Sequence, residues 1–541
     1  MNCTSNRLPY SATGYFSKII TDYLQQHPDL APFYRHSPDF NGIEVAIRER
    51  QLFQQQRPVL VQALEAQYAN VNSSQAVKNN IQLLAEKDTF TITTAHQPVI
   101  FTGTLFFIYK ILHVIKLTEA CKQRWPQYNF VPVFYMGSED ADLDELGSIW
   151  LNNEKITWDT RQTGAVGRMK TTGLQKIIAR IEGELSVQQH GPELLQLLKD
   201  CYQQQADIQS ATLQLVDTLF NRYGLVVLIP DHPQLKQLMA PVFEDDLFNQ
   251  TASQIAARTI ERLGKHYKVQ AHPRAINLFY LKDDIRERIE KNGDHWEVVG
   301  KNIRFTREDL LLELKQHPER FSPNVILRGL FQETVLPNIA FVGGGGELAY
   351  WLELKGIFEH YKVPYPVLLV RNSFLIVEKK WQEKIKHLGF CAEDFFKPAQ
   401  TLLSTLVTRG RADVLQLEQE LEEVKKFYGQ LKEKAGKIDS TLEKHIEALR
   451  AKATRPLYEL EKKMLRAEKR KYNDQSRQLQ AIKSALFPMN SLQERIENFM
   501  PFYARWGDAF INSLYQHSLT TEQVFVILYE DRIVSPSPAK S

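Results

Sequence analysis

The sequence contains few cysteines, and they are widely separated. Cys3, Cys121, Cys201 and Cys391 are the four in 541 residues, and none forms a CxxC motif or a Cys–His pair at metal-ligand spacing. A chain of this size with four scattered thiols is not a disulfide scaffold. Structural zinc sites gather their ligands at short, regular spacings, so the cysteines predict no metal site and zinc is not expected.

Long apolar runs are also absent. The runs 105–109 and 225–229 end after five residues at Lys110 and Pro230, whereas a membrane-spanning helix needs roughly 20 apolar residues. The first 15 residues lack the apolar segment of a secretory signal. We therefore expect a cytoplasmic protein without a membrane partner.

The chain has almost no excess of charge of either sign. It has 67 Lys and Arg against 64 Asp and Glu, a formal net charge of +3. A nucleic-acid-binding protein usually carries a strong basic excess, so nucleic acid is not an expected partner. Hydrophobic residues make up 43% and charged residues 24% of the chain, which is typical of a globular protein rather than a disordered one.

Short apolar segments alternate with helical ones in the middle of the chain. The segments 89–95, 130–136, 224–230 and 366–370 are β-branched or aliphatic and are bounded by turn residues, as buried strands are. A long helical pattern covers 104–122. This alternation predicts an α/β fold with a Rossmann-like, doubly wound parallel sheet.

Four regions are expected along the chain. They are a helical N-terminal segment packed on the core, the Rossmann-like core with two insertions, a coiled-coil helical hairpin, and a C-terminal segment with a disordered tail at 535–541. Insertions in such a sheet usually form the rim of the binding cleft. The expected bounds are 1–85, 86–400 with insertions at about 150–220 and 264–320, 401–490, and 491–541.

The region 411–485 has the spacing of a coiled coil. Apolar residues from Leu417 to Leu449 recur close to every seventh position, with Glu and Lys between them. Pro456 interrupts this pattern, and proline suits the first turn of a new helix, so we expect the chain to reverse near 451–456. The stripe packs either within one hairpin or between two chains. We favour a homodimer, because a two-helix hairpin leaves part of its stripe exposed.

The first candidate site is TTAHQPVIFTGT, residues 93–104. A predicted strand ends at a polar turn that carries His96 and Gln97, and Gly103 precedes the next helix. The N–H groups at the start of that helix would attract phosphate or carboxylate, with Lys110 as a further partner. The alternative is a histidine that only caps or packs.

The second candidate is the acidic segment 136–147, which follows another predicted strand. Five carboxylates within seven residues would repel one another unless some are solvated, cap a helix, or hold a cation or a substrate ammonium group. The alternative is a set of acids favoured at a helix N-terminus. We favour function for Glu139, Asp140 and Asp142, and give less weight to Asp144 and Glu145.

The third candidate is a run of four glycines between an apolar strand and a helix. Glycine permits positive φ and lets a ligand approach the backbone, so this segment is a candidate phosphate-binding loop, although a tight turn is the alternative. Polar and aromatic residues on the helix would face the same cleft. The residues are Gly343, Gly344, Gly345, Gly346, Glu347, Tyr350 and Trp351. Arg328 and Arg371 each end an apolar, strand-like run and are candidate anion-binding residues.

These motifs resemble a family of cysteine-adding enzymes of bacillithiol biosynthesis. The likeness rests on residues 95–112, 131–146 and 319–355 and on the C-terminal helical pair. It implies a Rossmann-type core related to class I aminoacyl-tRNA synthetases, a coiled coil that mediates dimerisation, and an amide-forming ligase that joins cysteine to glucosaminyl-malate. His96 and Gln97 match the element that stands in for the synthetase HIGH motif, and the acidic and glycine segments match the other two signatures.

Two departures from the family pattern are visible. Ala141 stands where the acidic signature has a histidine, and no KMSKS-like loop is present. Amide formation requires an activated carboxylate, so we expect ATP or ADP as the nucleotide, with Mg²⁺ accompanying it. A non-catalytic scaffold and a synthetase-like nucleotidyltransferase remain the alternatives.

Overall fold

The computed structural model describes residues 1–541 except 2, 411–416, 470–471 and 532–541. The described chain forms two compact units. One consists of Met1–Leu375 and Ser491–Ser541, and the other of Ile376–Asn490. Residues 376–400, assigned to the core from the sequence, thus fall in the second unit. The expected disordered tail, 535–541, lies outside the described residues.

A five-stranded parallel sheet forms the centre of the first unit. Its order is β13–β12–β2–β3–β6, and every neighbouring pair is parallel. In chain order this is 5-4-1-2-3, the arrangement of a doubly wound sheet. The predicted α/β class is confirmed. The strands are Thr89–His96 (β2), Asn129–Met136 (β3), Val226–Leu228 (β6), Asn338–Gly343 (β12) and Val367–Val370 (β13).

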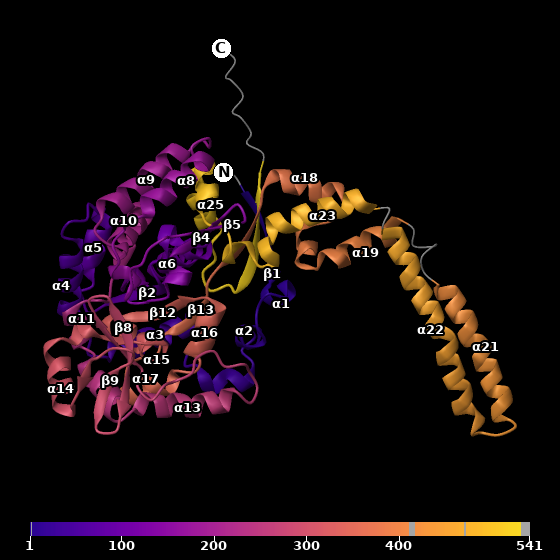
Figure 1. The fold of residues 1–541 in the computed structure, drawn as a ribbon, viewed down its shortest axis with the longest axis horizontal. Helices are drawn as coiled ribbons and strands as arrows, with labels where there is room; N and C mark the ends of the chain where they lie inside the picture. Colours follow the sequence, from indigo (N-terminus) through magenta and orange to yellow (C-terminus); the bar gives the residue numbers. More distant parts are fainter. Residues whose placement is uncertain (2, 411–416, 470–471, 532–541) are drawn as a thin grey trace, which may run out of the picture. The chain divides into compact units, whose positions relative to one another are not determined.

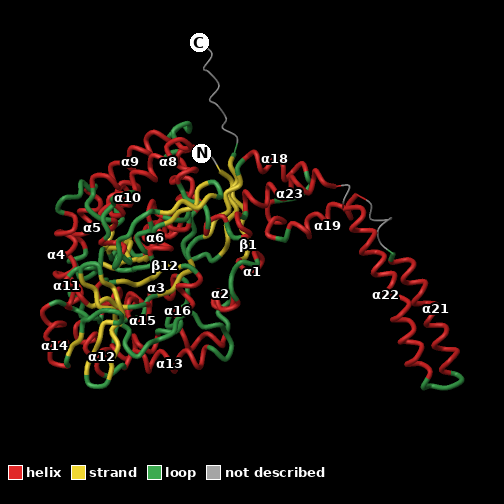
Figure 2. Tube along the Cα trace, in the orientation of Figure 1, coloured by secondary structure: helices red, strands yellow, loops and turns green. Residues whose placement is uncertain are grey.

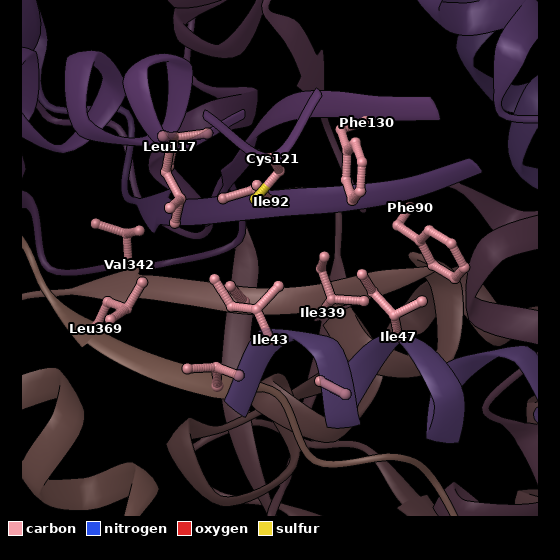
Figure 3. Close-up of a cluster of buried hydrophobic side chains, with 14 of the residues drawn as sticks. Ile43, Ile47, Phe90, Ile92, Leu117, Cys121, Phe130, Ile339, Val342 and Leu369 are labelled. Carbon is pink, nitrogen blue, oxygen red and sulfur yellow. The ribbon is translucent and has the colours of Figure 1, made fainter. Parts of the chain in front are cut away.

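One face of this sheet packs against α3 (Phe40–Gln51) and α6 (Phe106–Arg124). Ile43 of α3 and Leu117 of α6 join residues of β2, β12 and β13 in a single buried cluster (Figure 3). Both side chains are fully buried, and each contributes about 1.5–3 kcal/mol by leaving water. α6 is apolar on most of its sides, which places it inside the molecule.

The other face of β12 contacts different helices. Side chains alternate along a strand, so Phe341 points away from the cluster of Figure 3. Its ring stacks on Trp351 of α16 (Gly345–Trp351) at 4.7 Å, and Trp351 stacks on Phe358 of α17 (Lys355–Tyr361) at 5.6 Å. Trp351 was expected in the cleft. It is instead fully buried, because its indole packs between the sheet and α17.

Further helices surround this sheet and its additions (Figure 1). They are α1 (Tyr10–Thr13), α2 (Lys18–Leu24), α4 (Arg57–Tyr68), α5 (Gln75–Leu83), α7 (Leu143–Leu146), α8 (Leu174–Leu185), α9 (Gly191–Gln204), α10 (Ile208–Phe220), α11 (Pro233–Gln237), α12 (Ala240–Phe248), α13 (Thr251–Leu263), α14 (Arg307–Gln316), α15 (Val325–Val335), α24 (Met500–Trp506) and α25 (Asp508–His517).

The chain leaves the central sheet in two places to form smaller sheets. Between β3 and β6 it makes an antiparallel hairpin, β4 (Ser148–Leu151) and β5 (Glu154–Thr157). Between β6 and β12 it makes an antiparallel sheet of order β10–β9–β8–β7–β11. Its strands are Leu278–Lys282 (β7), Ile285–Asn292 (β8), His295–Val298 (β9), Arg304–Phe305 (β10) and Phe321–Pro323 (β11).

The two ends of the described chain meet in a third sheet. β1 (Cys3–Pro9) pairs antiparallel with β15 (Val524–Glu530), and Cys3 lies opposite Glu530. The expectation of a helical segment over 1–85 is therefore wrong for its first residues. β1 is mostly polar and exposed, so only a partner strand from the far end of the sequence makes it a strand.

The second unit is built of helices (Figure 2). α21 and α22 are packed side by side as a hairpin. The chain enters this unit within β14 (Ser373–Val377). The helices are α18 (Lys379–His387), α19 (Ala399–Gly410), α21 (Glu418–Gly436), α22 (Leu442–Lys469) and α23 (Asn473–Leu486).

The hairpin turns earlier than the sequence predicts. α21 ends at Gly436, and the Asp439 side chain accepts a hydrogen bond from the Thr441 N–H at 2.8 Å in the turn. α22 then continues through Pro456, so the expected reversal near 451–456 is wrong. The Asp439 turn makes the break because its side chain satisfies a backbone donor, whereas Pro456 costs the helix only local hydrogen bonding.

Candidate active site

The carboxyl ends of the central strands open into a cavity of about 590 Å³. Residues that follow all five strands line it: Gln97 after β2, Gly137 after β3, Pro230 after β6, Gly344 after β12 and Arg371 after β13. β2 and β12 are the neighbours at which the winding of the sheet reverses, and ligands of doubly wound sheets bind at that point. The cavity is therefore the candidate active site.

His96 ends β2 and is held as a neutral imidazole. Its ring contacts Phe106 and Phe107 of α6, with centroids 5.2 and 5.5 Å away. Burial and the nearby charge of Lys110 lower the pKa of His96 to about 3. At neutral pH the ring can donate or accept a hydrogen bond, but it offers no positive charge to an anion.

Lys110 and Glu347 form an ion pair in the cavity wall. Lys110 is only 2% exposed and also donates to the Ala95 carbonyl at 2.9 Å. Burial raises the pKa of Glu347, but Lys110 and the Gly344 N–H, which donates to it at 2.8 Å, lower that pKa by more. Glu347 therefore stays ionised, and a phosphate near Lys110 would also face this carboxylate.

The glycine segment turns from β12 into α16 without any left-handed residue. None of its four glycines has a positive φ, so the expectation that they permit a left-handed backbone is wrong. They provide space instead. A Cβ on Gly343 would lie 2.7 Å from the side chains of Leu348 and Phe341, so this glycine serves packing.

The next three glycines expose bare backbone to the cavity. Gly344, Gly345 and Gly346 line it, whereas Gly343 does not. A Cβ on Gly344 would lie 3.4 Å from the Glu347 carboxylate, and a Cβ on Gly346 would meet nothing within 4 Å. The segment thus divides into a packing residue and a surface that a ligand can approach closely.

Arg371 comes from the loop after β13 and is 5% exposed. Its Nη2 donates to Glu494 at 2.8 Å. Its Nε is buried and has no hydrogen-bond partner in the described part of the chain, and a Cβ on Gly344 would lie 3.8 Å from it. One donor of Arg371 is therefore available beside the glycine segment.

Arg328 and Arg495 also line the cavity, and neither forms an ion pair within the described ranges. Arg328 donates to the Tyr350 hydroxyl. It lies on α15 rather than at a strand end as expected, because Asn324 caps a helix there by accepting from the Ile326 N–H at 2.8 Å. This part of the wall carries unbalanced positive charge.

Glu139 belongs to a buried ionic network on another part of the wall. It pairs with Lys236 of α11, which is fully buried, and accepts from the Ser322 hydroxyl at 3.1 Å. Lys236 also lies 3.7 Å from Asp231, whose carboxylate accepts two hydrogen bonds from Arg168 at 2.6 and 2.7 Å. Glu139 is therefore balanced and held in place.

Asp140 has a different environment. Its carboxylate accepts from the Gln97 side chain at 3.2 Å and from the Asp142 N–H at 3.2 Å, and it forms no ion pair among the described residues. The His96–Gln97 turn and the acidic segment, 43 residues apart, thus meet through one hydrogen bond. Asp140 is the carboxylate of this segment best placed to meet a ligand.

Four predicted site residues lie outside the lining. Asp142 caps α7 by accepting from the Glu145 N–H at 3.1 Å, as the capping alternative predicts, while Glu145 itself lines the cavity. Gly103 has φ +66° in the turn before α6, and Trp351 is in the core. The remaining predicted residues share one cavity, with the exception of Gly343.

Sequence reasoning missed several residues of the wall. Ser138, Arg286 and Arg495 line the cavity, and Lys236 holds Glu139. Ser138 lies inside the acidic segment, so the motif could have identified it. Arg286 comes from β8 and Arg495 from a segment beyond the second unit, and no local pattern marks either one.

Two negative findings concern the described residues. They hold no group of three or more His, Cys, Asp or Glu side chains that could bind a metal ion. Among their helices, none is both long and apolar enough to cross a membrane.

Two parts of the chain match the domains of one protein family. Residues 1–372 match the model described as the N-terminal Rossmann-like domain of the bacillithiol biosynthesis protein BshC, and residues 374–530 match its C-terminal coiled-coil domain. The chain belongs to the BshC family. The resemblance predicted from the three motifs is confirmed.

Family members are similar over nearly their whole length. A protein of Flavobacterium johnsoniae named "Putative cysteine ligase BshC" is 39% identical over 96% of this chain and 99% of its own. One of Cytophaga hutchinsonii with the same name is 38% identical over 93% of this chain and 94% of its own. A solved structure described as a "putative arginyl t-RNA synthetase" from Campylobacter jejuni aligns over 83% of this chain and 98% of its own at 11% identity, with a TM-score of 0.22, which is too low to test a kinship with synthetases.

Proposed function

We propose that this protein is a cysteine ligase of bacillithiol biosynthesis that joins the carboxyl group of cysteine to the amine of glucosaminyl-malate. The observation that carries the proposal is the convergence of the His96–Gln97 turn, the acidic segment and the glycine segment on one cavity at the switch point of the sheet. The names of the BshC relatives support the choice of cysteine.

The part of the wall with excess positive charge suits an anionic substrate group. Arg328 and Arg495 have no carboxylate partner within the described residues, and the buried Nε of Arg371 is unpaired beside Gly344. Charge-assisted hydrogen bonds from arginine to phosphate or carboxylate are among the strong polar interactions in proteins. These groups fit the phosphates of ATP or ADP.

ATP, when bound, would supply the leaving group that activates the cysteine carboxyl group. Mg²⁺ in such sites uses one or two protein carboxylates in addition to phosphate oxygens, and Glu145 lines the cavity. The protein's own part is to hold the phosphates with Arg328, Arg371 and Arg495 and to position the acyl group. Preorganised donors of this kind lower a barrier by several kcal/mol.

The amide-forming step needs a proton acceptor. The amine nitrogen of glucosaminyl-malate forms a bond to the cysteine carbonyl carbon, and the bond from that carbon to the activating oxygen breaks. The nitrogen then loses a proton. We assign this proton to Asp140, because its carboxylate has no cationic partner in the described chain while Glu139 is neutralised by Lys236.

The helical hairpin supports a homodimer. Leu421 of α21 is buried, and α21 packs on α22. Leu442, Leu449 and Leu460 of α22 are 37–46% exposed and recur on one side of that helix. A second hairpin could bury them. Leu449→Glu with Leu460→Glu should halve the mass measured by light scattering, and a wild-type mass of one chain would refute the dimer.

The decisive experiment is a purified-enzyme assay with cysteine, glucosaminyl-malate and ATP, scored by mass for the thiol product. We expect product with the wild type and a loss of at least about a hundredfold in rate with Asp140→Asn, the scale of a lost general base. Asp144→Asn is the matched control, because that residue does not line the cavity. Absence of product with the wild type would favour a non-catalytic scaffold.

A further inference from the structure

Two opposite charges on the acidic side of the cavity have no ion-pair partner among the described residues. Glu139 is balanced by Lys236, and Asp231 is balanced by Arg168. Asp140 has only neutral hydrogen-bond donors. Arg286, which lines the same cavity, forms no ion pair with any described residue.

Arg286 is held in a fixed orientation. Its guanidinium lies 4.0 Å from the ring centroid of Phe279, and its Nε donates to the Ser322 hydroxyl at 3.4 Å. The same hydroxyl donates to Glu139. With the Nε edge engaged and one face on an aromatic ring, the terminal nitrogens remain to meet a ligand. A planar guanidinium presented in this way suits a carboxylate, which accepts two parallel hydrogen bonds.

The Arg286 and Asp140 charges influence each other but are not joined. Burial lowers the pKa of Arg286, and the charges of Asp140 and Glu139 act against that shift. No ion pair forms between Arg286 and Asp140, so their charged atoms are more than 4.0 Å apart. Two unpaired opposite charges that face one cavity are stabilised by a ligand carrying the complementary pair.

Further groups at this place fit a small ligand. The Ser138 hydroxyl is fully buried, lines the cavity, and has no hydrogen-bond partner among the described residues. Unsatisfied buried hydroxyls are uncommon and call for a partner. Pro230, Pro323 and Val325 add apolar surface to the lining, enough for a short side chain.

We propose that Arg286 and Asp140 form a subsite for a free α-amino acid, with the guanidinium binding its carboxylate and the Asp140 carboxylate binding its ammonium group. Under the proposed function this amino acid is cysteine, and its CH₂–SH group lies on the apolar surface. The subsite separates recognition of the amino acid from recognition of the anion at Arg328 and Arg495. Activation changes the carboxylate of the amino acid but not its α-ammonium group. The ammonium group stays on one carboxylate oxygen of Asp140, and the other oxygen accepts the proton of the second substrate.

The test measures binding without nucleotide or sugar, so it does not depend on turnover. Isothermal titration in a non-thiol reductant compares L-cysteine with cysteamine, which lacks the carboxylate, and with 3-mercaptopropionate, which lacks the ammonium group. We expect the wild type to bind L-cysteine at least tenfold more tightly than either analogue. Arg286→Met should abolish the preference for L-cysteine over cysteamine and keep the preference over 3-mercaptopropionate. Asp140→Asn should have the reverse effect.

Arg288→Met is the matched control, because Arg288 lies on the same strand, pairs with Glu290 and does not line the cavity. It should keep both preferences. A misfolded variant would weaken all three ligands together, so the selective loss is diagnostic. Failure of the wild type to bind L-cysteine, or an Arg286→Met protein that still discriminates against cysteamine, would overturn the subsite. If the ligase assay gives no product, selective binding of L-cysteine would still support the subsite.

Discussion

The α/β unit and the helical hairpin use charge in opposite ways. In the α/β unit, Lys110 pairs with Glu347 with only 2% of the lysine exposed. In the hairpin, Lys432 pairs with Glu443 and Glu447 at the surface. Burying a charge costs free energy that only a well-placed partner offsets, whereas a surface pair is screened by water and salt. The Lys110–Glu347 pair thus depends on a fixed geometry in the cavity wall, whereas the hairpin pairs do not.

Apolar residues show the reverse contrast. The α/β unit buries Ile43, Phe90 and Leu117 completely, while the hairpin leaves Leu442 and Leu449 partly in water. Exposed leucines spaced along one side of a helix are a feature of surfaces that pack against another chain. The α/β unit therefore keeps a charged pair inside, and the hairpin carries apolar side chains at its surface.

The largest effect is expected from breaking the buried pair. Lys110→Met leaves Glu347 charged and unpaired, and removal of one partner of a buried pair costs about 3–5 kcal/mol. Urea unfolding measures the loss. The double variant Lys110→Met with Glu347→Leu should recover much of this stability. An unstable double variant would show that the pair itself, rather than an unpaired charge, is what the fold requires.

Two substitutions in the glycine segment should have different effects, one on stability and the other on ligand binding. Gly343→Val places side-chain atoms against Leu348 and Phe341 and should lower the free energy of unfolding by about 1–3 kcal/mol. Gly344→Val has room but points between Glu347 and Arg371, so it should weaken ATP binding with little change in the melting temperature. Equal destabilisation by both variants would assign the whole segment to packing.

Acid should destabilise the α/β unit through His96. Its pKa is about 3 in the folded protein and roughly 6.5 when unfolded. The unfolded chain binds the extra proton, so the stability present above pH 6.5 falls as pH drops towards 3. Between pH 6.5 and 5 this contributes about 1.5 kcal/mol. His96→Gln should lose stability less steeply over that interval, and an unchanged slope would contradict a buried neutral imidazole.

The smallest effect is expected at the hairpin surface. Lys432→Ala removes a partner of Glu443 and Glu447, and it should change the free energy of unfolding far less than Lys110→Met does, because water and salt screen a surface pair. The change should also shrink at high salt. Denaturant unfolding at two ionic strengths measures both. A loss as large as that of Lys110→Met would erase the contrast between the units.

The sequence was sufficient for the strands of the central sheet and for much of the site. The apolar segments around 89–95, 130–136 and 366–370 are β2, β3 and β13, because continuous β-branched or aliphatic runs are typical of strands buried on both faces of a parallel sheet. Arg328 was misread, since ILRGLF is equally apolar as a strand or as the buried side of a helix. Pro456 was misread because a long helix tolerated it.

Local pattern alone determined where His96, Gln97, Asp140 and the glycines stand, since each follows a strand and parallel strands end at one edge of a sheet. Tertiary structure decided which of them carry free charge. Glu139 is paired with Lys236 and Lys110 with Glu347, while Asp140 and Arg286 form no ion pair among the described residues. The two ion pairs join residues that are 97 and 237 positions apart in the sequence. No sequence pattern predicts them, because electrostatic energy depends on distance in space and on burial.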